Sequence, residues 1–224
     1  MNVLDQAREA LAGALARFPG PACLTCSFQA EDMAVLHMAR EFRPELPVIF
    51  LETGYHFRET LEYRDRMARE WGLRLLNAGA RLSRAEQESQ FGQLYRTDPG
   101  RCCRIRKVEP LLEELENYDL WITGLRREQS PTRSGLQIEE THRLPSGRTI
   151  VKLNPLAFWT WKDVLSYAVA HEIPLLPLYG QGYTSIGCEP CTSKPADASK
   201  PRSGRWGGAK LECGIHTFDK GGGE

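Results

Sequence analysis

Seven cysteines are the side chains of this chain best suited to chemistry, because a thiolate binds metal ions and attacks electrophilic atoms. Cys102 and Cys103 are adjacent, while Cys188 and Cys191 are separated by two residues. A two-residue spacer is common in metal sites. Two close pairs that lie far apart in the sequence can therefore supply four thiolates to one centre.

The adjacent pair bears on which metal that centre would hold. Neighbouring residues on a helix point about 100 degrees apart, so Cys102 and Cys103 converge poorly on one small ion. A cube of several irons accepts this spread more easily, which favours a [4Fe–4S] cluster over a structural zinc. Two buried cysteines beside an accidental pair remain the alternative without metal.

Cys213 stands apart from these pairs, in the segment ECGIH. It follows a basic stretch, and nearby positive charge favours the thiolate, so Cys213 is either a nucleophile or an idle surface thiol. A lone nucleophilic cysteine cannot resolve its own adduct as a disulfide and needs an external dithiol. Cys23 and Cys26 lie on a predicted strand, facing opposite sides, and are interpreted as core residues.

Two loops are candidates for binding an anion. Arg126, Arg127 and Arg133 lie in the segment LRREQSPTR. Guanidinium groups bind phosphate and sulfate through paired hydrogen bonds, although an ordinary charged surface loop would be the favoured interpretation without the position of this segment after a predicted strand. Residues 27–32 lack the paired glycines that let a backbone wrap a pyrophosphate, so we do not expect them to hold a long polyphosphate. The alternative for this segment is an ordinary turn before a helix.

Composition narrows the class of protein. The 224 residues are 41% hydrophobic, which can support one sizeable core. The formal net charge of zero argues against a dedicated nucleic-acid binder, and the lack of a run of about 18 apolar residues argues against a membrane span. The N-terminus does not resemble a signal peptide, and the odd number of cysteines disfavours a disulfide framework. We therefore expect a cytoplasmic protein whose basic loops suit a small anionic ligand.

The elements that must position these residues alternate between strands and helices. This alternation predicts an α/β fold with a Rossmann-like, doubly wound parallel sheet. Ligands of such sheets bind beyond the carboxyl ends of the strands, which places residues 27–32, 52–55 and 124–133 at one mouth. The expected strands are 22–28, 48–53, 73–78, 119–123 and 148–153, and the expected helices include a first amphipathic helix and residues 32–42, 57–71 and 160–171.

The C-terminal part of the chain has a different composition. Residues 193–208 are rich in Lys, Arg, Ser, Pro and Gly, which is typical of a mobile segment. We therefore expect an α/β domain over residues 1–192 and a mobile, flexible C-terminal tail over residues 193–224 that carries Cys213. The last residues, 221–224, are expected to be disordered.

A resemblance to a known family rests on six segments: SFQAEDM, FLETG, CCRIRKVEPL, TGLRREQSPTR, GCEPCT and ECGIH. Together they resemble the assimilatory adenylyl-sulfate reductases of the phosphoadenylyl-sulfate reductase family, which has the adenine nucleotide alpha-hydrolase-like fold. The resemblance covers about residues 22–219. It implies reduction of adenylyl sulfate to sulfite and AMP, in sulfate assimilation and cysteine biosynthesis, with thioredoxin or glutaredoxin as electron donor.

The resemblance also implies roles for individual residues. Cys213 matches the catalytic cysteine, which would carry the S-sulfocysteine intermediate. One [4Fe–4S] cluster per chain would be held by Cys102, Cys103, Cys188 and Cys191. The substrate would be bound by Ser27, Leu51, Lys107, Gly124, Arg126, Arg127, Arg133, Arg202 and Arg205.

Several alternatives remain at this point. Family members with all four cysteines usually take adenylyl sulfate, so this is the substrate we expect. The main alternative function is that of a phosphoadenylyl-sulfate reductase or of an enzyme that accepts both nucleotides. An ATP-using adenylating or thiolating enzyme of the same fold would need the glycine-rich loop that residues 27–32 lack. A non-enzymatic metal-binding module that senses redox state or binds nucleic acid would leave Cys213 dispensable. The sequence leaves the role of His216 and a homo-oligomeric state open.

Overall fold

The computed structural model describes residues 2–197, 200–208, 210 and 212–216. Its centre is a six-stranded sheet with the order β3-β2-β1-β4-β6-β5. All neighbouring pairs are parallel except β5 with β6, so the predicted parallel α/β sheet is confirmed and gains one antiparallel edge strand. The strands are β1 (Ala22–Thr25), β2 (Val48–Glu52), β3 (Leu75–Gly79), β4 (Leu120–Ile122), β5 (Glu139–Arg143) and β6 (Thr149–Leu153).

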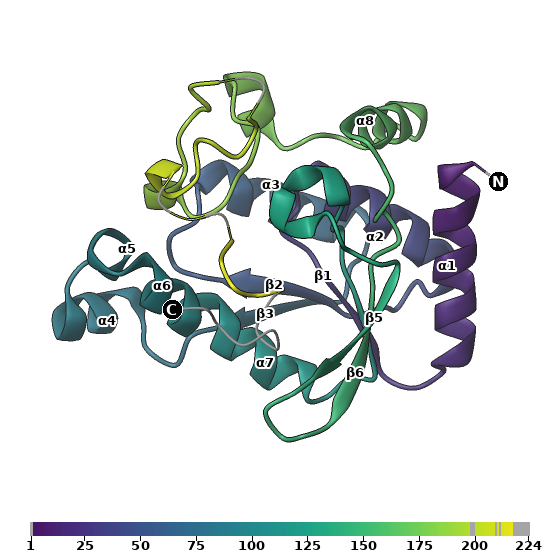
Figure 1. Cartoon of the computed structure of the whole chain (residues 1–224), viewed down its shortest axis with the longest axis horizontal. Helices are drawn as coiled ribbons and strands as arrows, with labels where there is room; N and C mark the ends of the chain where they lie inside the picture. The colour runs from purple at the N-terminus through teal and green to yellow at the C-terminus, as the bar shows by residue number, and fades with distance from the viewer. Residues whose placement is uncertain (1, 198–199, 209, 211, 217–224) are drawn as a thin grey trace.

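Helices cover the sheet, and further helices lie beyond one end of it (Figure 1). The predicted capping box at Thr160 is confirmed, since Asp163 N donates to Thr160 Oγ1 and Asp163 Oδ2 accepts from Thr160 N. Within the described ranges, none of the helices combines the length and apolar character needed to cross a membrane. The α-helices are α1 (Val3–Arg17), α2 (Ala30–Phe42), α3 (Arg58–Glu70), α4 (Arg84–Phe91), α5 (Leu94–Thr97), α6 (Pro99–Cys103), α7 (Glu109–Leu115) and α8 (Trp161–Ala170).

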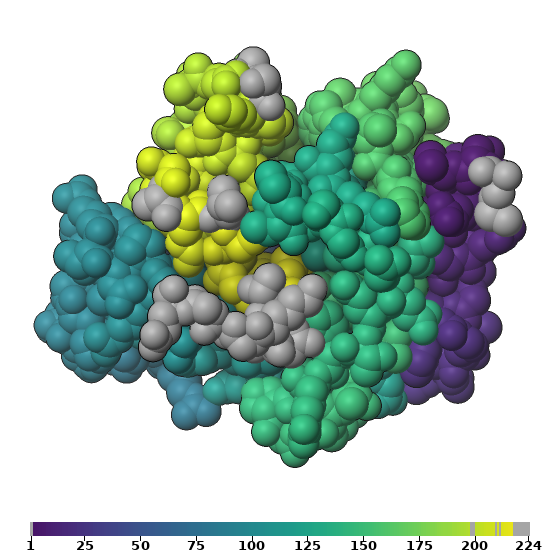
Figure 2. Space-filling model, in the orientation of Figure 1, coloured from purple at the N-terminus to yellow at the C-terminus, as the bar shows by residue number. Residues whose placement is uncertain are grey.

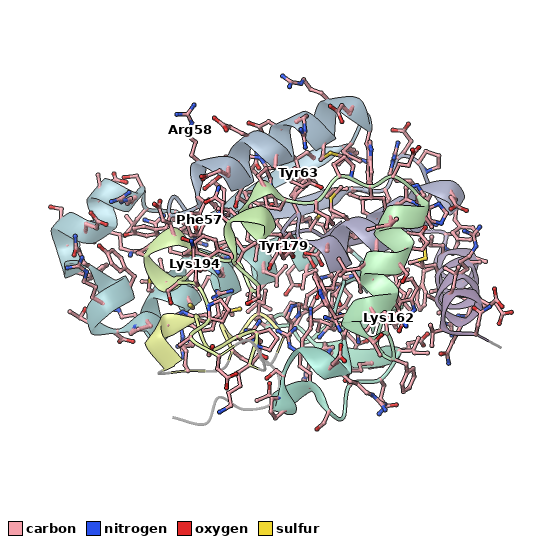
Figure 3. The ribbon with its side chains drawn as sticks, turned by 90° about the horizontal axis from the view of Figure 1, so that it is seen from above. Phe57, Arg58, Tyr63, Lys162, Tyr179 and Lys194 are labelled. Atoms are coloured by element: carbon pink, nitrogen blue, oxygen red, sulfur yellow. The ribbon has the colours of Figure 1, made fainter. Side chains whose placement is uncertain are left out.

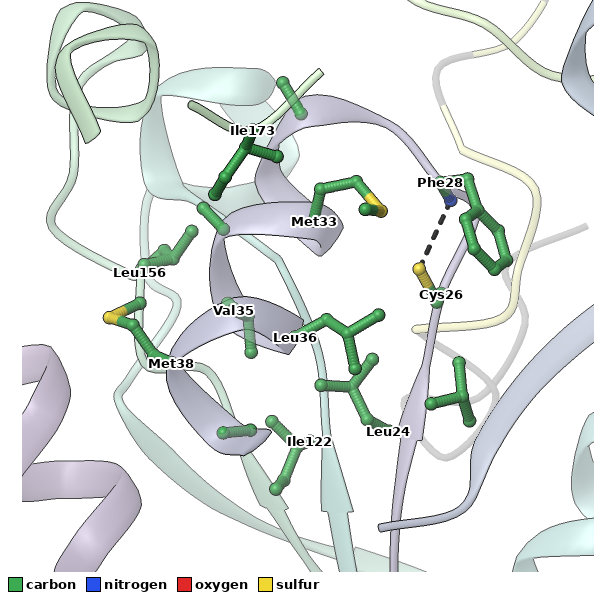
Figure 4. Packing of buried hydrophobic residues seen from close by; sticks show 14 of the residues in the cluster. Leu24, Cys26, Phe28, Met33, Val35, Leu36, Met38, Ile122, Leu156 and Ile173 are labelled. Carbon is green, nitrogen blue, oxygen red and sulfur yellow. Dashed lines mark hydrogen bonds between the residues drawn. The ribbon is translucent and has the colours of Figure 1, made fainter. Parts of the chain in front are cut away.

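The two faces of the sheet bury separate sets of side chains, because successive residues of a strand point to opposite faces. Leu24 and Cys26 pack with residues of α1, α2, α3 and α8. Figure 4 shows this face, with Leu24 beside α2. Cys23 and Ile49 pack on the other face with residues of α7. Cys23 and Cys26 are both buried and face opposite sides, which confirms their interpretation as core residues.

Helices α4, α5 and α6 form an arm beyond β3 and β2 that the sequence did not predict (Figure 1). The arm leads into a π-helix, η1 (Arg104–Val108), which continues into α7. A π-helix is rare and frequently marks a functional site. This wide turn starts directly after the adjacent cysteines of α6.

The C-terminal part of the chain packs above the carboxyl ends of the strands (Figure 1). Ser193 N donates to the Gly204 carbonyl at 2.8 Å, and Thr192 forms a β-bridge with Arg205. Arg205 and Trp206 are buried. These contacts join the described part of residues 193–208 to the loop that carries Cys188 and Cys191, while the mobility of this segment and the boundary at residue 192 stay predictions. The expected disorder of residues 221–224 lies outside the described residues.

Candidate active site

A cavity of about 560 Å³ lies beyond the carboxyl ends of β1, β2 and β4. Its floor includes Ser27 after β1, Leu51 near the end of β2 and Gly124 after β4. Strands β1, β2 and β3 follow one another to one side of the sheet, and the chain then returns to place β4 on the other side of β1. Ligands of α/β sheets bind at such a switch point, here between β1 and β4. The volume lies within the range of small-molecule sites, about 300 to 1,000 Å³.

The loop after β1 uses a carboxylate where a phosphate loop would offer free backbone groups. Asp32 Oδ2 accepts hydrogen bonds from Ser27 N at 2.7 Å and from Ser27 Oγ at 2.6 Å. A side chain at Gly124 would place its Cβ 2.3 Å from Asp32 Oδ1, so only glycine fits there. Burial raises the pKa of Asp32 to about 6. The loop is therefore filled by its own acid and has little room for a polyphosphate, in line with the sequence-based expectation.

Phe28 takes up the strained position of this loop. Its φ of +60° lies in the left-handed region, which bulky residues seldom adopt. The ring is fully buried and packs edge-on against Phe50 and Tyr63. Phe28 N donates to Cys26 Sγ at 3.4 Å, as the dashed line in Figure 4 shows. Aromatic packing thus holds the turn that brings Ser27 to the cavity.

The three arginines of the 124–133 loop have different surroundings. Arg126 is buried and forms ion pairs with Glu31 at 2.8 Å and Glu128 at 2.7 Å, although it still borders the cavity. Arg127 does not line the cavity; its Nε donates to the Leu136 carbonyl, and its guanidinium lies over an exposed phenylalanine ring. The structure therefore does not bring Arg127 to the predicted substrate site.

Arg133, Arg202 and Arg205 line the cationic end of the cavity. Burial lowers the pKa of Arg202 to about 10, with the charge of Arg133 adding to this effect, yet the guanidinium stays charged at neutral pH. Arg205 Nε is buried and has no hydrogen-bond partner within the described residues. A buried cation with an unused donor is suited to an anionic ligand.

The four predicted metal-binding cysteines line a second, smaller cavity beside the first. Cys102 and Cys103 come from α6, while Cys188 precedes the short helix η5 (Glu189–Cys191) and Cys191 is its last residue. All four are free thiols. Burial, together with the nearby Cys188, Cys103 and Cys102, raises the pKa of Cys191 to about 11. The structure thus brings the two pairs together as predicted.

The surroundings of the four thiols bear on what they could hold. In the part of the chain that the structure describes, no three His, Cys, Asp or Glu side chains are grouped closely enough to hold a metal ion. Arg106 also lines the cysteine cavity, and its buried Nη2 has no hydrogen-bond partner among the described residues. Its Nε donates to Gln87 Oε1 at 2.8 Å. A buried cation facing four spread thiols suits a larger group of negative charge better than one ion.

Lys107 lines both cavities, because the π-helix η1 carries it past the adjacent cysteines toward the sheet. Burial lowers its pKa, but Cys188, Cys213 and Cys103 raise it by more, so the net pKa lies above the ordinary value. The ammonium group is therefore protonated at neutral pH. It links the cysteine cavity electrostatically to the Cys213 thiol.

Cys213 lines the main cavity together with Ile215 and His216. The sulfur interacts electrostatically with Lys107 and Arg202. His216 stacks on Trp121 with ring centroids 5.5 Å apart and an interplanar angle of 15°. Burial shifts the pKa of His216 well below its ordinary value, so the imidazole is neutral. The sequence predicted the nucleophile but left the histidine unassigned.

Other cavity residues escaped the sequence analysis. Gln29 Oε1 accepts from Ile186 N at 2.8 Å, which ties the loop after β1 to the segment before Cys188. Tyr179 lies on η4 (Pro177–Gln181) beside α3, near the centre of the view in Figure 3. Its hydroxyl accepts from Ala30 N at 3.3 Å. Gln29 belongs to the loop that the sequence placed at the mouth, although its contact was not predicted, whereas Tyr179 closes the cavity from a distant segment that no local pattern marks.

Comparison with known proteins agrees with this geometry. Residues 21–194 match the family described as "Phosphoadenosine phosphosulfate reductase domain". An adenosine 5'-phosphosulfate reductase from Rhodococcus opacus is 45% identical, over 84% of this chain and 75% of the relative. One from Mycobacterium tuberculosis strain H37Rv is 44% identical, over 86% of this chain and 77% of the relative.

A solved structure shares the same architecture. The phosphoadenylyl-sulfate reductase from Candida auris, in a phosphate complex, superimposes with a TM-score of 0.69 and 25% identity. The match covers 82% of this chain and 88% of the other. The fold, the match over residues 21–194 and the identity to curated relatives show that this chain belongs to the phosphoadenosine phosphosulfate reductase family.

Proposed function

We propose that this chain reduces adenylyl sulfate to sulfite and AMP, using a thioredoxin or glutaredoxin dithiol and an S-sulfocysteine intermediate on Cys213. The observation that carries the proposal is the cavity itself, which combines Cys213, Lys107 and several arginines beyond the strand ends. The curated relatives at 44–45% identity, which are named adenosine 5'-phosphosulfate reductases, support this substrate.

The proposal assigns the two ends of the cavity to the two ends of the substrate. The adenosine part lies over Ser27, the backbone near Leu51 and Gly124. The phosphate and sulfate lie toward Lys107, Arg133 and the basic pair Arg202 and Arg205, because the cationic side chains gather there. Arg126 and Arg133 contribute less charge than Lys107 and Arg205, since Glu31 and Glu128 neutralise Arg126 and Glu212 pairs with Arg133, and Arg127 is not needed.

The first step is attack of the Cys213 thiolate on the sulfur atom of the sulfate group. A bond forms between Sγ and that sulfur, while the bond from the sulfur to the bridging oxygen breaks and AMP leaves with its electron pair. Lys107 and Arg202 stabilise the negative charge that develops on the phosphate and sulfonate oxygens. Because His216 is neutral and stacked on Trp121, we assign it no proton transfer.

The second step releases sulfite. A thiolate of the donor dithiol attacks Cys213 Sγ, sulfite departs with the electron pair, and the second donor thiol then reduces the mixed disulfide. The donor supplies both electrons, so this chain needs no resolving cysteine of its own. This reaction would place the chain in sulfate assimilation in the cytoplasm.

We further propose that Cys102, Cys103, Cys188 and Cys191 hold one [4Fe–4S] cluster. The four thiols that line one cavity and the buried Arg106 cation beside them support an anionic group held there. When bound, the cluster would supply a fixed local field rather than electrons for the two steps above. Lys107 borders both cavities, so the cluster would position its ammonium group beside the substrate's anionic end and tune the electrostatic potential there.

A comparison of two nucleotides tests the proposed reaction. Sulfite release is measured with adenylyl sulfate and with its 3'-phosphorylated form, in the presence of thioredoxin and its reductase. We expect the wild-type protein to favour adenylyl sulfate and Cys213→Ser to release no sulfite. A preference for the 3'-phosphorylated nucleotide would instead support the function named for the Candida auris relative. Sulfite release by Cys213→Ser would contradict the whole scheme.

A further inference from the structure

Glu212, the residue directly before Cys213, is held by three side chains. Its Oε1 accepts from Arg133 Nε at 2.9 Å and from Thr132 Oγ1 at 3.0 Å, and its Oε2 accepts from Arg133 Nη2 at 2.7 Å. Arg202 Nη2 lies 3.7 Å from Oε2. The side chains of Glu212 and Arg133 are only 14% and 11% exposed. A paired contact of this kind fixes the direction of the carboxylate as well as its position.

The socket that receives Glu212 is built from its own loop. Arg133 Nη1 donates to Gln129 Oε1, so this guanidinium is oriented from the opposite side as well. Ser130 caps the short helix η3 (Pro131–Arg133), because its Oγ accepts from Thr132 N at 3.4 Å. Both side chains that bind the carboxylate are therefore positioned by contacts within residues 129–133.

The chain is also held on the other side of Cys213. Ile215 packs against the core face formed by Cys23, Ile49 and α7, and His216 stacks on Trp121 of β4. Cys213 thus lies between two fixed points, one polar and one apolar, at the wall of the cavity. Figure 2 shows yellow C-terminal residues between the blue-green arm and the green part of the chain.

We propose that Glu212 is a positioning residue: its carboxylate, bound by Arg133 and Thr132, seats the Cys213 thiol for attack on the bound nucleotide. This inference rests on the proposed function, because it concerns the rate of the first step. The carboxylate binds a loop 79 residues away in the sequence, whose Arg133 also lines the cavity. Loss of that contact removes the polar one of the two points that hold the segment around Cys213 among the described residues.

Glu212→Gln tests the proposal. The amide keeps the shape of the side chain but loses the charge that both arginine contacts need. We expect S-sulfonation in a single turnover at saturating adenylyl sulfate to slow about 10-fold to 100-fold, since a small misplacement of a reacting group has effects of this size. Iron content should stay unchanged, AMP should bind no more weakly, and the melting temperature should fall, because the paired contact with Arg133 is lost. Alkylation of Cys213 by iodoacetamide in the resting protein should become faster.

Matched variants separate positioning from general damage. Glu62→Gln removes the carboxylate of an exposed ion pair with Arg58 and should leave every readout unchanged. Glu212→Asp should recover part of the lost rate, because it restores the charge. If Glu212→Gln does not fold, Thr132→Val removes one hydrogen bond to the same carboxylate and should slow S-sulfonation more mildly.

The outcomes distinguish this inference from the proposed function. An unchanged S-sulfonation rate in Glu212→Gln, with adduct forming normally in the wild type, would overturn the positioning role alone. Tighter AMP binding without a slower rate would also overturn it, since Glu212 would then compete with the nucleotide for Arg133. Absence of any adduct in the wild type would defeat the proposed function itself.

Discussion

Asp32 shows how a single residue changes what a nucleotide loop can bind. Its carboxylate lies in the first turn of α2, where the helix N-terminus would otherwise attract an anion. Ser27 donates two hydrogen bonds to it, and Gly124 leaves just enough space for it. The loop therefore holds a buried acid as part of its own structure. This explains in physical terms why a polyphosphate is not expected here.

The titration of Asp32 predicts a pH-dependent stability. Its pKa is about 6 in the folded protein and about 3.9 in an unfolded chain. The folded state binds the proton more tightly, so the free energy of unfolding falls as pH rises from about 4 to about 6. In Asp32→Asn this loss is absent. We expect the stability of the variant relative to wild type to increase by about 1 kcal/mol between pH 5 and pH 7, measured by thermal unfolding.

The prediction concerns how the stability difference between Asp32→Asn and wild type changes with pH. The sign of that difference at a single pH is not predicted, because the amide changes the hydrogen bonds with Ser27 at every pH. A relative stability that is constant between pH 5 and pH 7, or that decreases, would show that Asp32 is ionised throughout this range. Glu113→Gln is a suitable control, since its carboxylate pairs with Arg81 on the surface.

At the residue scale the sequence predicted types of chemistry better than it predicted contacts. In the sequence, Arg126, Arg127 and Arg133 lie in one segment and are equivalent candidates for binding an anion. Only the fold shows that one is neutralised by two carboxylates, one turns to a backbone carbonyl, and one binds Glu212. These differences depend on partners up to 95 residues away, which no local pattern encodes.

At the scale of elements, the strands with apolar runs and the long helices were predictable, because burial imposes a period on their side chains. Strand β5 was not, since Glu139–Arg143 is a polar edge strand with one buried residue. Helices α4 to α6 are short and bury few side chains, so they lack a repeating apolar pattern. The π-helix η1 depends on how the arm joins α7, and the sequence offers no signal for it.

The arm and the η5 loop carry the four cysteines that we expect to hold iron. Cys188→Ser should lose iron, because it removes one of the four thiols around the smaller cavity. Cys23→Ala should keep its iron, because Cys23 is buried on the sheet face that packs against α7. Iron content and the visible absorption spectrum of the purified variants check both. Full iron in Cys188→Ser, with a native melting temperature, would contradict the assignment.

At the scale of the whole molecule, two cavities share a wall. Lys107, Arg205 and Trp206 line both, and the segment around Cys213 closes the larger one. These residues come from the π-helix and from the C-terminal part of the chain, which lie side by side only in the folded protein. The family resemblance predicted the set of cysteines and a place for Lys107 near both the cluster and the substrate, but not the π-helix that carries this lysine.

The central claim is that Cys213 bonds to the sulfur of the substrate, and the mass of the intact protein tests it most directly. The wild-type protein is mixed with adenylyl sulfate without any thiol reductant, and the adduct is located by peptide mapping. We expect the protein to gain the mass of one sulfonate group on Cys213, and this gain should disappear when thioredoxin is added. No mass gain, or a sulfonate on another cysteine such as Cys26 of the same cavity, would contradict it.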